Sequence, residues 1–401
     1  MLERTLMPGA RVVLCLNAGS SSLKFSVWAG EECLGQGEVE EIGRPEAVAW
    51  LKTAGGGERR LPGRWADHGE AVDGVFALMS EHAVPEPAGV GHRLVHGGRD
   101  HLAPERVTED LLADLRALVP LAPLHLPSGI AGVEVVAKNF PSLPQAVCFD
   151  TAFHRDLPEV ARRLALPRAL ADPAGIQRFG FHGLSYEYVM ERLGPAGRGR
   201  VVIAHLGNGA SMAAVRDGCA VDTTMGLTPA GGLMMGTRTG DLDPGVLVYL
   251  AREKGYDADG LDRLVNKESG LLGVSGVSAD MKTLLEQRGR DERAALAVAM
   301  FVYQVRKQVG AFAAALGGLD SLVFTGGIGE RAAPVRAEIC DGLGHLGVHL
   351  DPARNAAHGD PASMPGSGCQ VRIVATREDL MIARHTRGVL FPDGERRHRG
   401  Q

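Results

Sequence analysis

Polar residues suited to binding phosphate and a metal ion follow the first apolar run of the chain. Residues 12–16 lead to Asn17, a Gly-Ser turn follows at 19–22, and Lys24 lies just beyond it. Oriented backbone amides in such a turn form an anion-binding nest, and a side-chain oxygen such as that of Asn17 could hold hydrated Mg²⁺. The pattern therefore predicts a polyphosphate site, with a simple hairpin that has a polar tip as the alternative.

Polar and apolar residues alternate after this turn, as they do in a half-buried strand. The two sets are Ser22, Lys24 and Ser26, and Leu23, Phe25 and Val27. Because side chains two residues apart share a face of a strand, we expect the first set on an open face and the second in a core.

Arg93 and Asp150 are candidates for binding charged groups. Arg93 precedes a Gly-Gly turn and could bind a carboxylate or phosphate with its planar fork. His92 and His96, four residues apart, could be a pair of metal ligands. Their segment lacks the Glu of a zinc protease motif, however, and its glycines argue against the helix that such a pair needs. Asp150 follows the apolar strand 146–149, where it could hold Mg²⁺ or cap the next turn.

His182 and Arg238 occur among glycines, a context that is costly to order. His182 lies between Gly180 and Gly183, and Arg238 lies in the Gly-rich segment 231–245. Arg238 could stabilise charge in a transition state; an exposed turn histidine and a solvated loop arginine are the alternatives. Segment 376–381 has the pattern of a capping box that opens a helix, a structural role that would itself explain Glu378.

Strand and helix patterns predict two similar α/β domains that flank a cleft. A strand–turn–strand pattern occurs at 12–27 and again at 201–215, and a further strand is predicted at 321–325. Helices are predicted at 108–118, 128–138, 185–193, 291–316 and 377–390, and surface loops at 54–64 and 120–127. The expected domains are 1–150 and 151–385, with the helix from about 380 packing back onto the first. There is no Gly-Lys dipeptide and hence no Walker A loop.

Composition narrows the function classes. The 401 residues are 45% apolar with a formal net charge of −5, which argues against a nucleic-acid binder. None of the six cysteines forms a Cys-x-x-Cys pair, so we expect a reducing compartment and no zinc site. The apolar runs are too short for a signal peptide or a membrane span. We therefore expect a cytoplasmic protein that binds neither nucleic acid nor membranes.

Together, these segments resemble the acetokinase family, in the same order and over most of the chain. The matching segments are 17–25, 91–98, 149–154, 178–185, 205–211, 224–229, 235–241 and 325–330. The resemblance implies a duplicated actin-like fold, as in sugar kinases, Hsp70 and actin. It also implies reversible, Mg²⁺-dependent phosphoryl transfer from ATP to acetate, giving acetyl phosphate and ADP, with Mn²⁺ as a possible substitute, and a homodimer.

The resemblance also assigns roles to individual residues. It assigns catalysis to Asp150, His182 and Arg238; acceptor binding to Arg93, Val95, Leu124, His125 and Pro229; nucleotide binding to Lys24, His205, Leu206, Gly207, Asn208, Gly209, Asp280, Met281, Lys282, Gly327, Ile328, Gly329, Glu330 and Arg331; and metal binding to Asn17 and Glu378. Because a carboxylate acceptor is already ionised at neutral pH, holding Mg²⁺ suits Asp150 better than acting as a base.

Three alternatives remain at this stage. A propionate or other short-chain carboxylate kinase would share nearly every motif, and an actin-like ATPase without an acceptor would not need Arg93 or an apolar pocket. A regulator with an inactive site is the third alternative. Against it, all the polar residues that the chemistry needs are present: Asn17, Arg93, Asp150, His182, Arg238 and Glu378. Segment 278–282 reads Ser-Ala-Asp-Met-Lys where the family commonly has Ser-Ser-Asp-Phe-Arg, and Arg331 and Arg377 stand where Asn is usual. Because Lys cannot stack or fork as Arg does, the preferred nucleotide is left open.

Overall fold

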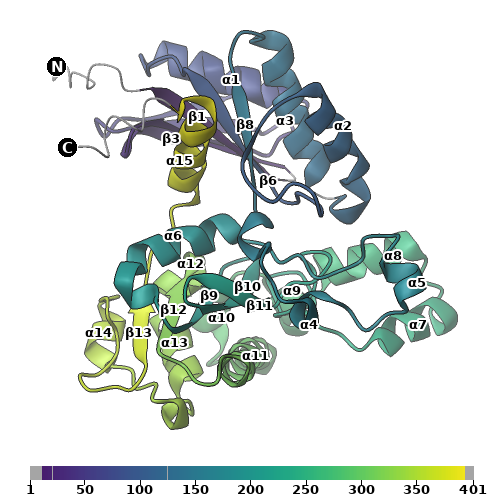
Figure 1. The fold of residues 1–401 in the computed structure, drawn as a ribbon, viewed down its shortest axis with the longest axis vertical. Coiled ribbons are helices and arrows are strands. Elements are labelled where there is room, and N and C mark those ends of the chain that lie inside the picture. The colour runs from purple at the N-terminus through teal and green to yellow at the C-terminus, as the bar shows by residue number, and fades with distance from the viewer. Residues whose placement is uncertain (1–10, 20, 124, 393–401) are drawn as a thin grey trace. The chain divides into compact units, whose positions relative to one another are not determined.

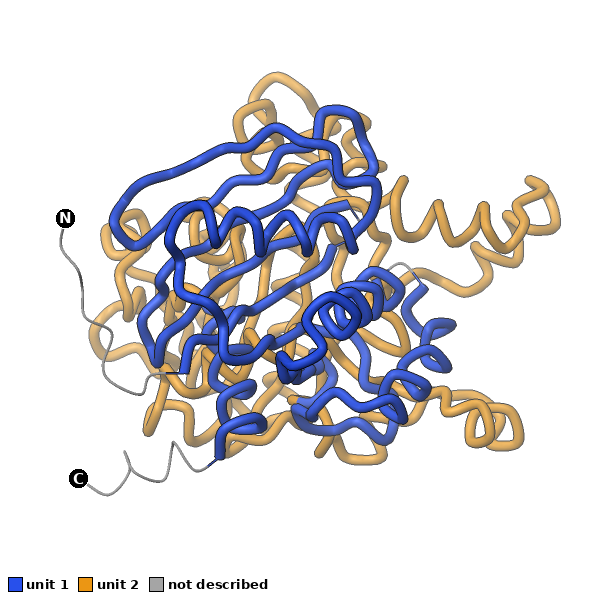
Figure 2. The backbone as a smooth tube through the Cα atoms, turned by 90° about the horizontal axis from the view of Figure 1, so that it is seen from above, with its two compact units in different colours: residues 1–152, 377–401 blue, residues 153–376 orange. Residues whose placement is uncertain are grey.

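The computed structural model describes residues 11–19, 21–123 and 125–392. The chain divides into two compact units, which Figure 2 shows in different colours. Unit 1 contains residues 1–152 and 377–401, and unit 2 contains residues 153–376. The polypeptide therefore contributes to unit 1 twice, once from each end.

Unit 1 is built on an eight-stranded sheet in the order β5-β4-β3-β2-β1-β6-β8-β7. Its strands are β1 (Val12–Ala18), β2 (Leu23–Ala29), β3 (Glu32–Glu40), β4 (Val48–Thr53), β5 (Glu58–Pro62), β6 (Gly89–Leu94), β7 (Glu105–Arg106) and β8 (Gln145–Phe149). Its helices are α1 (His68–Glu81), α2 (Glu109–Ala117), α3 (Leu126–Asn139) and α15 (Glu378–Leu390), with a 3₁₀ turn at Val119–Leu121.

Unit 2 is built on a five-stranded sheet in the order β11-β10-β9-β12-β13. Its strands are β9 (Arg200–Leu206), β10 (Ala210–Arg216), β11 (Cys219–Thr223), β12 (Ser321–Thr325) and β13 (Gln370–Ile373). Its helices are α4 (Glu159–Arg162), α5 (Arg168–Ala171), α6 (Gly183–Leu193), α7 (Pro244–Glu253), α8 (Ala258–Arg263), α9 (Gly270–Ser275), α10 (Met281–Gln287), α11 (Glu292–Leu316), α12 (Gly326–Arg331), α13 (Ala333–Cys340) and α14 (Pro352–Ala356).

The two sheets repeat one topology. In unit 1, β1 is antiparallel to β2 and parallel to β6, while β2–β3 is antiparallel and β6–β8 parallel. In unit 2, β9 has the same relation to β10 and β12, and the pairs β10–β11 and β12–β13 complete the repeat. The predicted duplication of an α/β fold is thereby confirmed.

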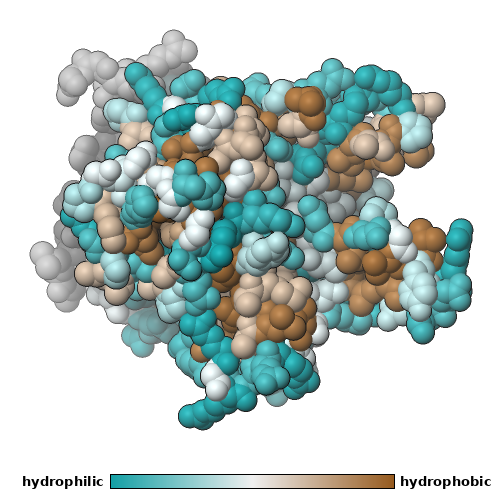
Figure 3. Space-filling model, turned by 90° about the horizontal axis from the view of Figure 1, so that it is seen from below, coloured by the Kyte–Doolittle hydropathy of each residue, from teal (hydrophilic) through white to brown (hydrophobic). Residues whose placement is uncertain are grey.

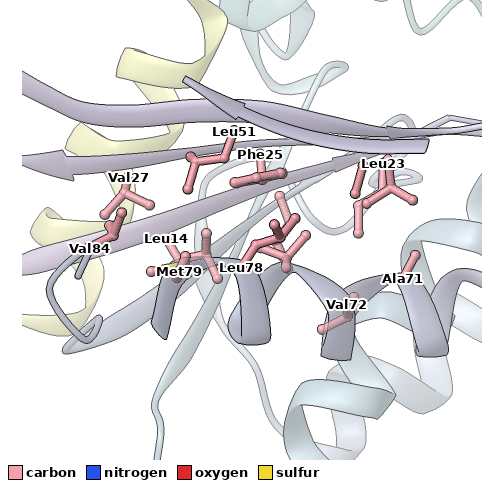
Figure 4. Packing of buried hydrophobic residues seen from close by; sticks show 14 of the residues in the cluster. Leu14, Leu23, Phe25, Val27, Leu51, Ala71, Val72, Leu78, Met79 and Val84 are labelled. Atoms are coloured by element: carbon pink, nitrogen blue, oxygen red, sulfur yellow. The ribbon is translucent and has the colours of Figure 1, made fainter. Parts of the chain in front are cut away.

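A buried apolar layer holds the first hairpin of unit 1 in place. Leu14, Phe25 and Val27 of the sheet face Leu78 and Met79 of α1, as Figure 4 shows. Full burial of such a side chain contributes about 1.5–3 kcal/mol. This layer fixes the strands on either side of the turn at 19–22.

Helix α15 packs against β1, β6 and β8 of unit 1 and is the yellow helix beside these strands in Figure 1. Its residues Leu380, Met381 and Ile382 are buried. Gly91 of β6 permits this close approach, because a Cβ at that position would collide with Thr386 Oγ1 and lie 2.8 Å from Ile382 Cγ2.

The structure corrects two local predictions and refines a third. The predicted loop 54–64 contains strand β5, which pairs with β4 at the sheet edge and is exposed throughout. Ser26 is buried instead of facing solvent: it accepts a hydrogen bond from Trp28 Nε1 at 2.8 Å, and α15 packs against β2. The predicted loop 120–127 includes the 3₁₀ turn and the start of α3. Among the described residues, no helix is long and apolar enough to cross a membrane.

We predict that Gly91→Ala lowers the stability of unit 1 by about 1–3 kcal/mol, because the added methyl group overpacks the contact with α15. Urea unfolding followed by tryptophan fluorescence measures this, since all three tryptophans, Trp28, Trp50 and Trp65, belong to unit 1. Gly132→Ala in α3 is the control, because its Cβ would meet nothing within 4 Å. Equal stability of the two variants would contradict the proposed packing.

Candidate active site

In unit 1, three neighbouring parallel strands bring polar side chains to one edge of the sheet. Asn17 lies in β1 opposite Arg93 of β6, and Asp150 directly follows β8. Because the carboxyl ends of parallel strands meet at the same edge, residues far apart in the sequence become neighbours. Lys24 of β2 pairs with Asn17 across the antiparallel ladder and is exposed.

Arg93 holds these strand ends together through its guanidinium group. Its Nε donates to Asp150 Oδ1 at 3.0 Å, its Nη2 donates to Asp150 Oδ2, and its Nη1 donates to Asn17 Oδ1 at 2.9 Å. The Asp150 side chain is 1% exposed, whereas that of Arg93 is 16% exposed. A guanidinium group has five N–H donors, so two N–H groups of Arg93 remain for a further anion among the residues that the structure describes.

Glu378, the first residue of α15, adds a second carboxylate to this cluster. Its Oε2 lies 3.9 Å from Arg93 Nε. Burial raises the pKa of Glu378, and the charge of Asp150 adds to this effect while Arg93 opposes it. Burial alone would lower the pKa of Arg93, but the charges of Asp150 and Glu378 raise it. Arg93 therefore stays charged, and a further cation beside Glu378 would favour its ionised form.

The predicted capping box before α15 is wrong. The N-cap is Arg377, which makes no side-chain cap hydrogen bond. The Thr376 hydroxyl is buried without a hydrogen-bond partner among the described residues, while its backbone N–H donates to Glu330 Oε1 at 3.0 Å. The charge cluster around Arg93, and not a capping box, accounts for the position of Glu378.

The donors in unit 1 fit a magnesium ion. Asn17 supplies an amide oxygen, and Asp150 and Glu378 supply carboxylates. Mg²⁺ commonly keeps several waters and needs only one or two carboxylates. The described residues contain no cluster of three His, Cys, Asp or Glu side chains arranged for a metal, so the fit depends on water and substrate oxygens as further ligands.

The residues expected to bind an acceptor are divided between the units. Val95 is buried directly after β6, and His125 precedes α3, both in unit 1. Leu124 lies outside the described residues. Pro229 belongs to unit 2, where its carbonyl oxygen accepts a hydrogen bond from Arg238 Nη1 at 3.2 Å.

In unit 2, His182 is held in a left-handed backbone conformation with φ of 59°. His154 supports this turn: its Nε2 donates to the Phe181 carbonyl oxygen at 3.1 Å, and its ring packs against Gly180. Burial lowers the pKa of His154 to about 4, so this support is neutral at physiological pH.

The His182 ring stacks on His205 of β9, with centroids 4.3 Å apart and an interplanar angle of 14°. Each ring has a serine partner at Nδ1: Ser211 Oγ lies 2.8 Å from His182 Nδ1, and Ser185 Oγ lies 2.8 Å from His205 Nδ1. The two imidazoles are therefore fixed in one parallel arrangement.

The turn between β9 and β10 lies beside two side chains that can donate hydrogen bonds to phosphate. An ideal Cβ on Gly209 would be 3.5 Å from His182 Nε2 and 3.7 Å from Arg238 Nη1. The missing side chain of Gly209 thus leaves space next to both groups. A Cβ on Gly207 would be 3.8 Å from the backbone nitrogen of Gly327, so α12 begins close to the same turn.

Further nucleotide candidates lie around this turn. Gly236 N donates to the Asn208 carbonyl oxygen at 3.0 Å, and a Cβ on Gly236 would be 3.2 Å from the Ala279 carbonyl oxygen. The segment 280–282 is therefore close: Asp280 caps α10 by accepting from Thr283 N, Met281 is buried and Lys282 is exposed. Leu206 ends β9 and is buried.

Helix α12 (Gly326–Arg331) is braced by two charged side chains. Glu330 Oε1 accepts hydrogen bonds from Gly326 N and Thr376 N, both at 3.0 Å. Arg336, which is fully buried, donates to the carbonyl oxygens of Gly329 and Glu330. Sequence reasoning did not single out Arg336, because no local pattern marks an arginine that supports backbone carbonyl groups. The same helix contains Ile328 and Arg331.

The repeated topology, with glycine turns beside His182 and Arg238 and a charged cluster around Arg93, defines a kinase of the duplicated actin-like fold. Residues 12–384 match the Acetokinase family, and the chain belongs to that family. It is thus a phosphotransferase with a carboxylate acceptor. Membership implies ATP as a substrate and a divalent metal.

Individual relatives support this assignment. Acetate kinase of Rhodopseudomonas palustris is 46% identical over 393 residues, which cover 93% of this chain and 97% of the relative. The crystal structure of Porphyromonas gingivalis acetate kinase is 40% identical with a TM-score of 0.88, covering 95% of this chain and 100% of that one. A propionate kinase from Francisella tularensis is 35% identical with a TM-score of 0.91 and the same coverage.

We predict that Asp150→Ala destabilises unit 1 by about 3–5 kcal/mol, because it removes the main partner of a largely buried guanidinium. Urea unfolding followed by tryptophan fluorescence gives the free energy of unfolding. Glu134→Ala is the matched control, since it breaks the exposed pair of Arg116 with Glu134 and should cost at most about 1 kcal/mol. If both variants lose the same stability, the ion pair between Arg93 and Asp150 does not hold the strand ends together.

Proposed function

We propose that the chain catalyses reversible, Mg²⁺-dependent phosphoryl transfer from ATP to acetate, giving acetyl phosphate and ADP. The observation that carries this proposal is the guanidinium of Arg93, fixed by Asn17 and Asp150 with two N–H groups to spare. A carboxylate is the anion that such a fork binds well. Buried Val95, two residues further on, suits the methyl group of acetate.

The acceptor needs no base. The acetate carboxylate is ionised at neutral pH, so its oxygen attacks the γ-phosphorus directly while the bond to the bridging β–γ oxygen breaks and ADP leaves. Asp150 is bound by two N–H groups of Arg93, which suits it to orienting Arg93 and the metal. We therefore assign Asp150 a positioning role in place of proton transfer.

In this proposal, unit 2 supplies the hydrogen-bond donors that contact the transferred phosphoryl group. His182 Nε2 and Arg238 Nη1 both lie beside the bare Gly209, where they would donate to phosphoryl oxygens. The turn 207–209, the start of α12 and segment 280–282 would bind the nucleotide, and Lys24 of unit 1 would contact phosphate. Arg238 is held by the Pro229 carbonyl oxygen.

Asn17 and Glu378 would hold the metal, with Asp150 close by. A bound Mg²⁺ would neutralise phosphate charge, and Mn²⁺ accepts the same oxygen ligands. Glu378 is suited to this task because burial penalises its charge in the absence of a cation.

Propionate is the second candidate acceptor. The similarity to a propionate kinase structure supports it, and one methylene in an apolar pocket changes the transition-state energy by only about 1–3 kcal/mol. An ATPase without an acceptor has less support, because it gives no role to the spare donors of Arg93.

A homodimer is also part of this proposal, as is a cytoplasmic location. Figure 3 shows apolar areas on one face of the molecule, and large exposed apolar side chains include Val248 and Tyr249 of α7. Helix α7 buries none of its residues. Exposed apolar surface of this kind is typical of protein interfaces.

Trapping of acyl phosphate as the hydroxamate tests the proposed function. With ATP and Mg²⁺, we expect product from acetate, a smaller yield from propionate, and kcat lowered about 10³-fold or more in Arg238→Ala, by analogy with arginine fingers. GTP and Mn²⁺ serve as parallel arms for nucleotide and metal preference. ATP hydrolysis without acyl phosphate would favour the ATPase, and an Arg238→Ala variant with more than a tenth of wild-type kcat would exclude its assigned role.

A further inference from the structure

Two buried hydroxyl groups form a chain that ends on His182. Ser211 Oγ lies 2.8 Å from His182 Nδ1 and 2.5 Å from the Tyr186 hydroxyl. Both Ser211, in β10, and Tyr186, in α6, are fully buried. None of the chemistry assigned so far uses either hydroxyl.

The direction of this chain decides which ring nitrogen carries hydrogen. If Tyr186 donates to Ser211 Oγ, the Ser211 hydroxyl hydrogen is directed to His182 Nδ1. Neutral His182 must then carry its own hydrogen on Nε2, because a neutral imidazole has one donor and one acceptor nitrogen. Nε2 is the atom that lies beside Gly209, the glycine that Arg238 Nη1 also approaches.

We propose that Ser211 and Tyr186 are positioning residues that keep His182 in the form with hydrogen on Nε2, ready to donate to a phosphoryl oxygen. This inference rests on the proposed function for its kinetic consequence. In the opposite neutral form, Nε2 would present a lone pair to an anionic oxygen and repel it. In general, the hydrogen bond made by one ring nitrogen of a histidine determines whether the other nitrogen carries a hydrogen.

The other groups around the ring are consistent with this assignment. His205 covers one face of His182 and has its own hydroxyl partner, Ser185. Arg238 Nη1 approaches the same glycine, Gly209, as His182 Nε2. His154 is buried, and its hydrogen bond to the Phe181 carbonyl oxygen restrains the backbone at His182 without contacting Nδ1.

The form of His182 can be measured without activity. The full chain labelled with ¹⁵N-histidine reports Nδ1 and Nε2 separately by NMR, and His182→Gln assigns the signal. We expect hydrogen on Nε2 in the wild type, and a partial or complete change to Nδ1 in Ser211→Ala. Ser185→Ala is the matched control, since it removes the same hydroxyl from the neighbouring ring and should leave the His182 signal in the Nε2 form. A neutral wild-type ring with hydrogen on Nδ1 would overturn the proposal.

Kinetics provide the second readout. Ser211→Ala should lower kcat by about 10- to 100-fold, by analogy with the loss of a group that orients a metal-binding histidine, with the KM values for acetate and ATP little changed. Tyr186→Phe should lower kcat in the same direction but less, and it keeps the test open if Ser211→Ala does not fold. Unchanged kcat in both variants overturns the proposal, and so does a changed His182 form with unchanged kcat. If the wild type forms no acyl phosphate, the proposed function fails, while the NMR result still tests the hydrogen position.

Discussion

The ion pair between Arg93 and Asp150 is the interaction on which the architecture of unit 1 depends. It joins the ends of β6 and β8, and the third hydrogen bond of Arg93 adds β1 through Asn17. A pair with so little exposure is expensive to separate, because removal of one partner leaves the other charged and unpaired. Among the described residues the same pair leaves two N–H groups of Arg93 available, and in the proposed function these would bind the carboxylate of the acceptor.

The duplicated sheet explains why both units present polar groups at comparable places. In each unit the central strand continues into a tight turn and an antiparallel neighbour, β1–β2 in unit 1 and β9–β10 in unit 2. These two equivalent turns carry different functional groups. The unit 1 hairpin carries Asn17 and Lys24 next to carboxylates, whereas the unit 2 hairpin carries Gly209 next to His182 and Arg238. In the proposed function, the unit 1 hairpin would contact the metal and a phosphate, whereas the groups beside the unit 2 hairpin would contact the transferred phosphoryl group.

Local patterns in the sequence predicted much of this fold. Alternation after Asn17 and the repeated strand–turn–strand segments gave both hairpins, and strand 321–325 matches β12. Predictions that depended on distant segments were less successful. Ser26 is buried because α15, more than 350 residues later in the chain, covers its side of the sheet, and Thr376 does not cap the helix that follows it. Pairing at the sheet edge likewise makes a strand of residues 58–62, within the predicted loop 54–64. The family motifs named Asn17, Arg93 and Asp150, but only the folded chain shows that Arg93 bonds to both. The supporting roles of Tyr186 and Arg336 have no local signal, because they arise from contacts between elements.

In the proposed function, Arg93 binds the acceptor through its planar fork while unit 2 binds the nucleotide. Steady-state kinetics of Arg93→Lys test it most directly, because lysine keeps the positive charge beside Asp150 but loses the fork. We predict that the KM for acetate rises by about tenfold or more, as expected for loss of a charge-assisted hydrogen bond, while the KM for ATP stays nearly unchanged. A large rise in the KM for ATP with unchanged saturation by acetate would show that Arg93 does not bind the acceptor.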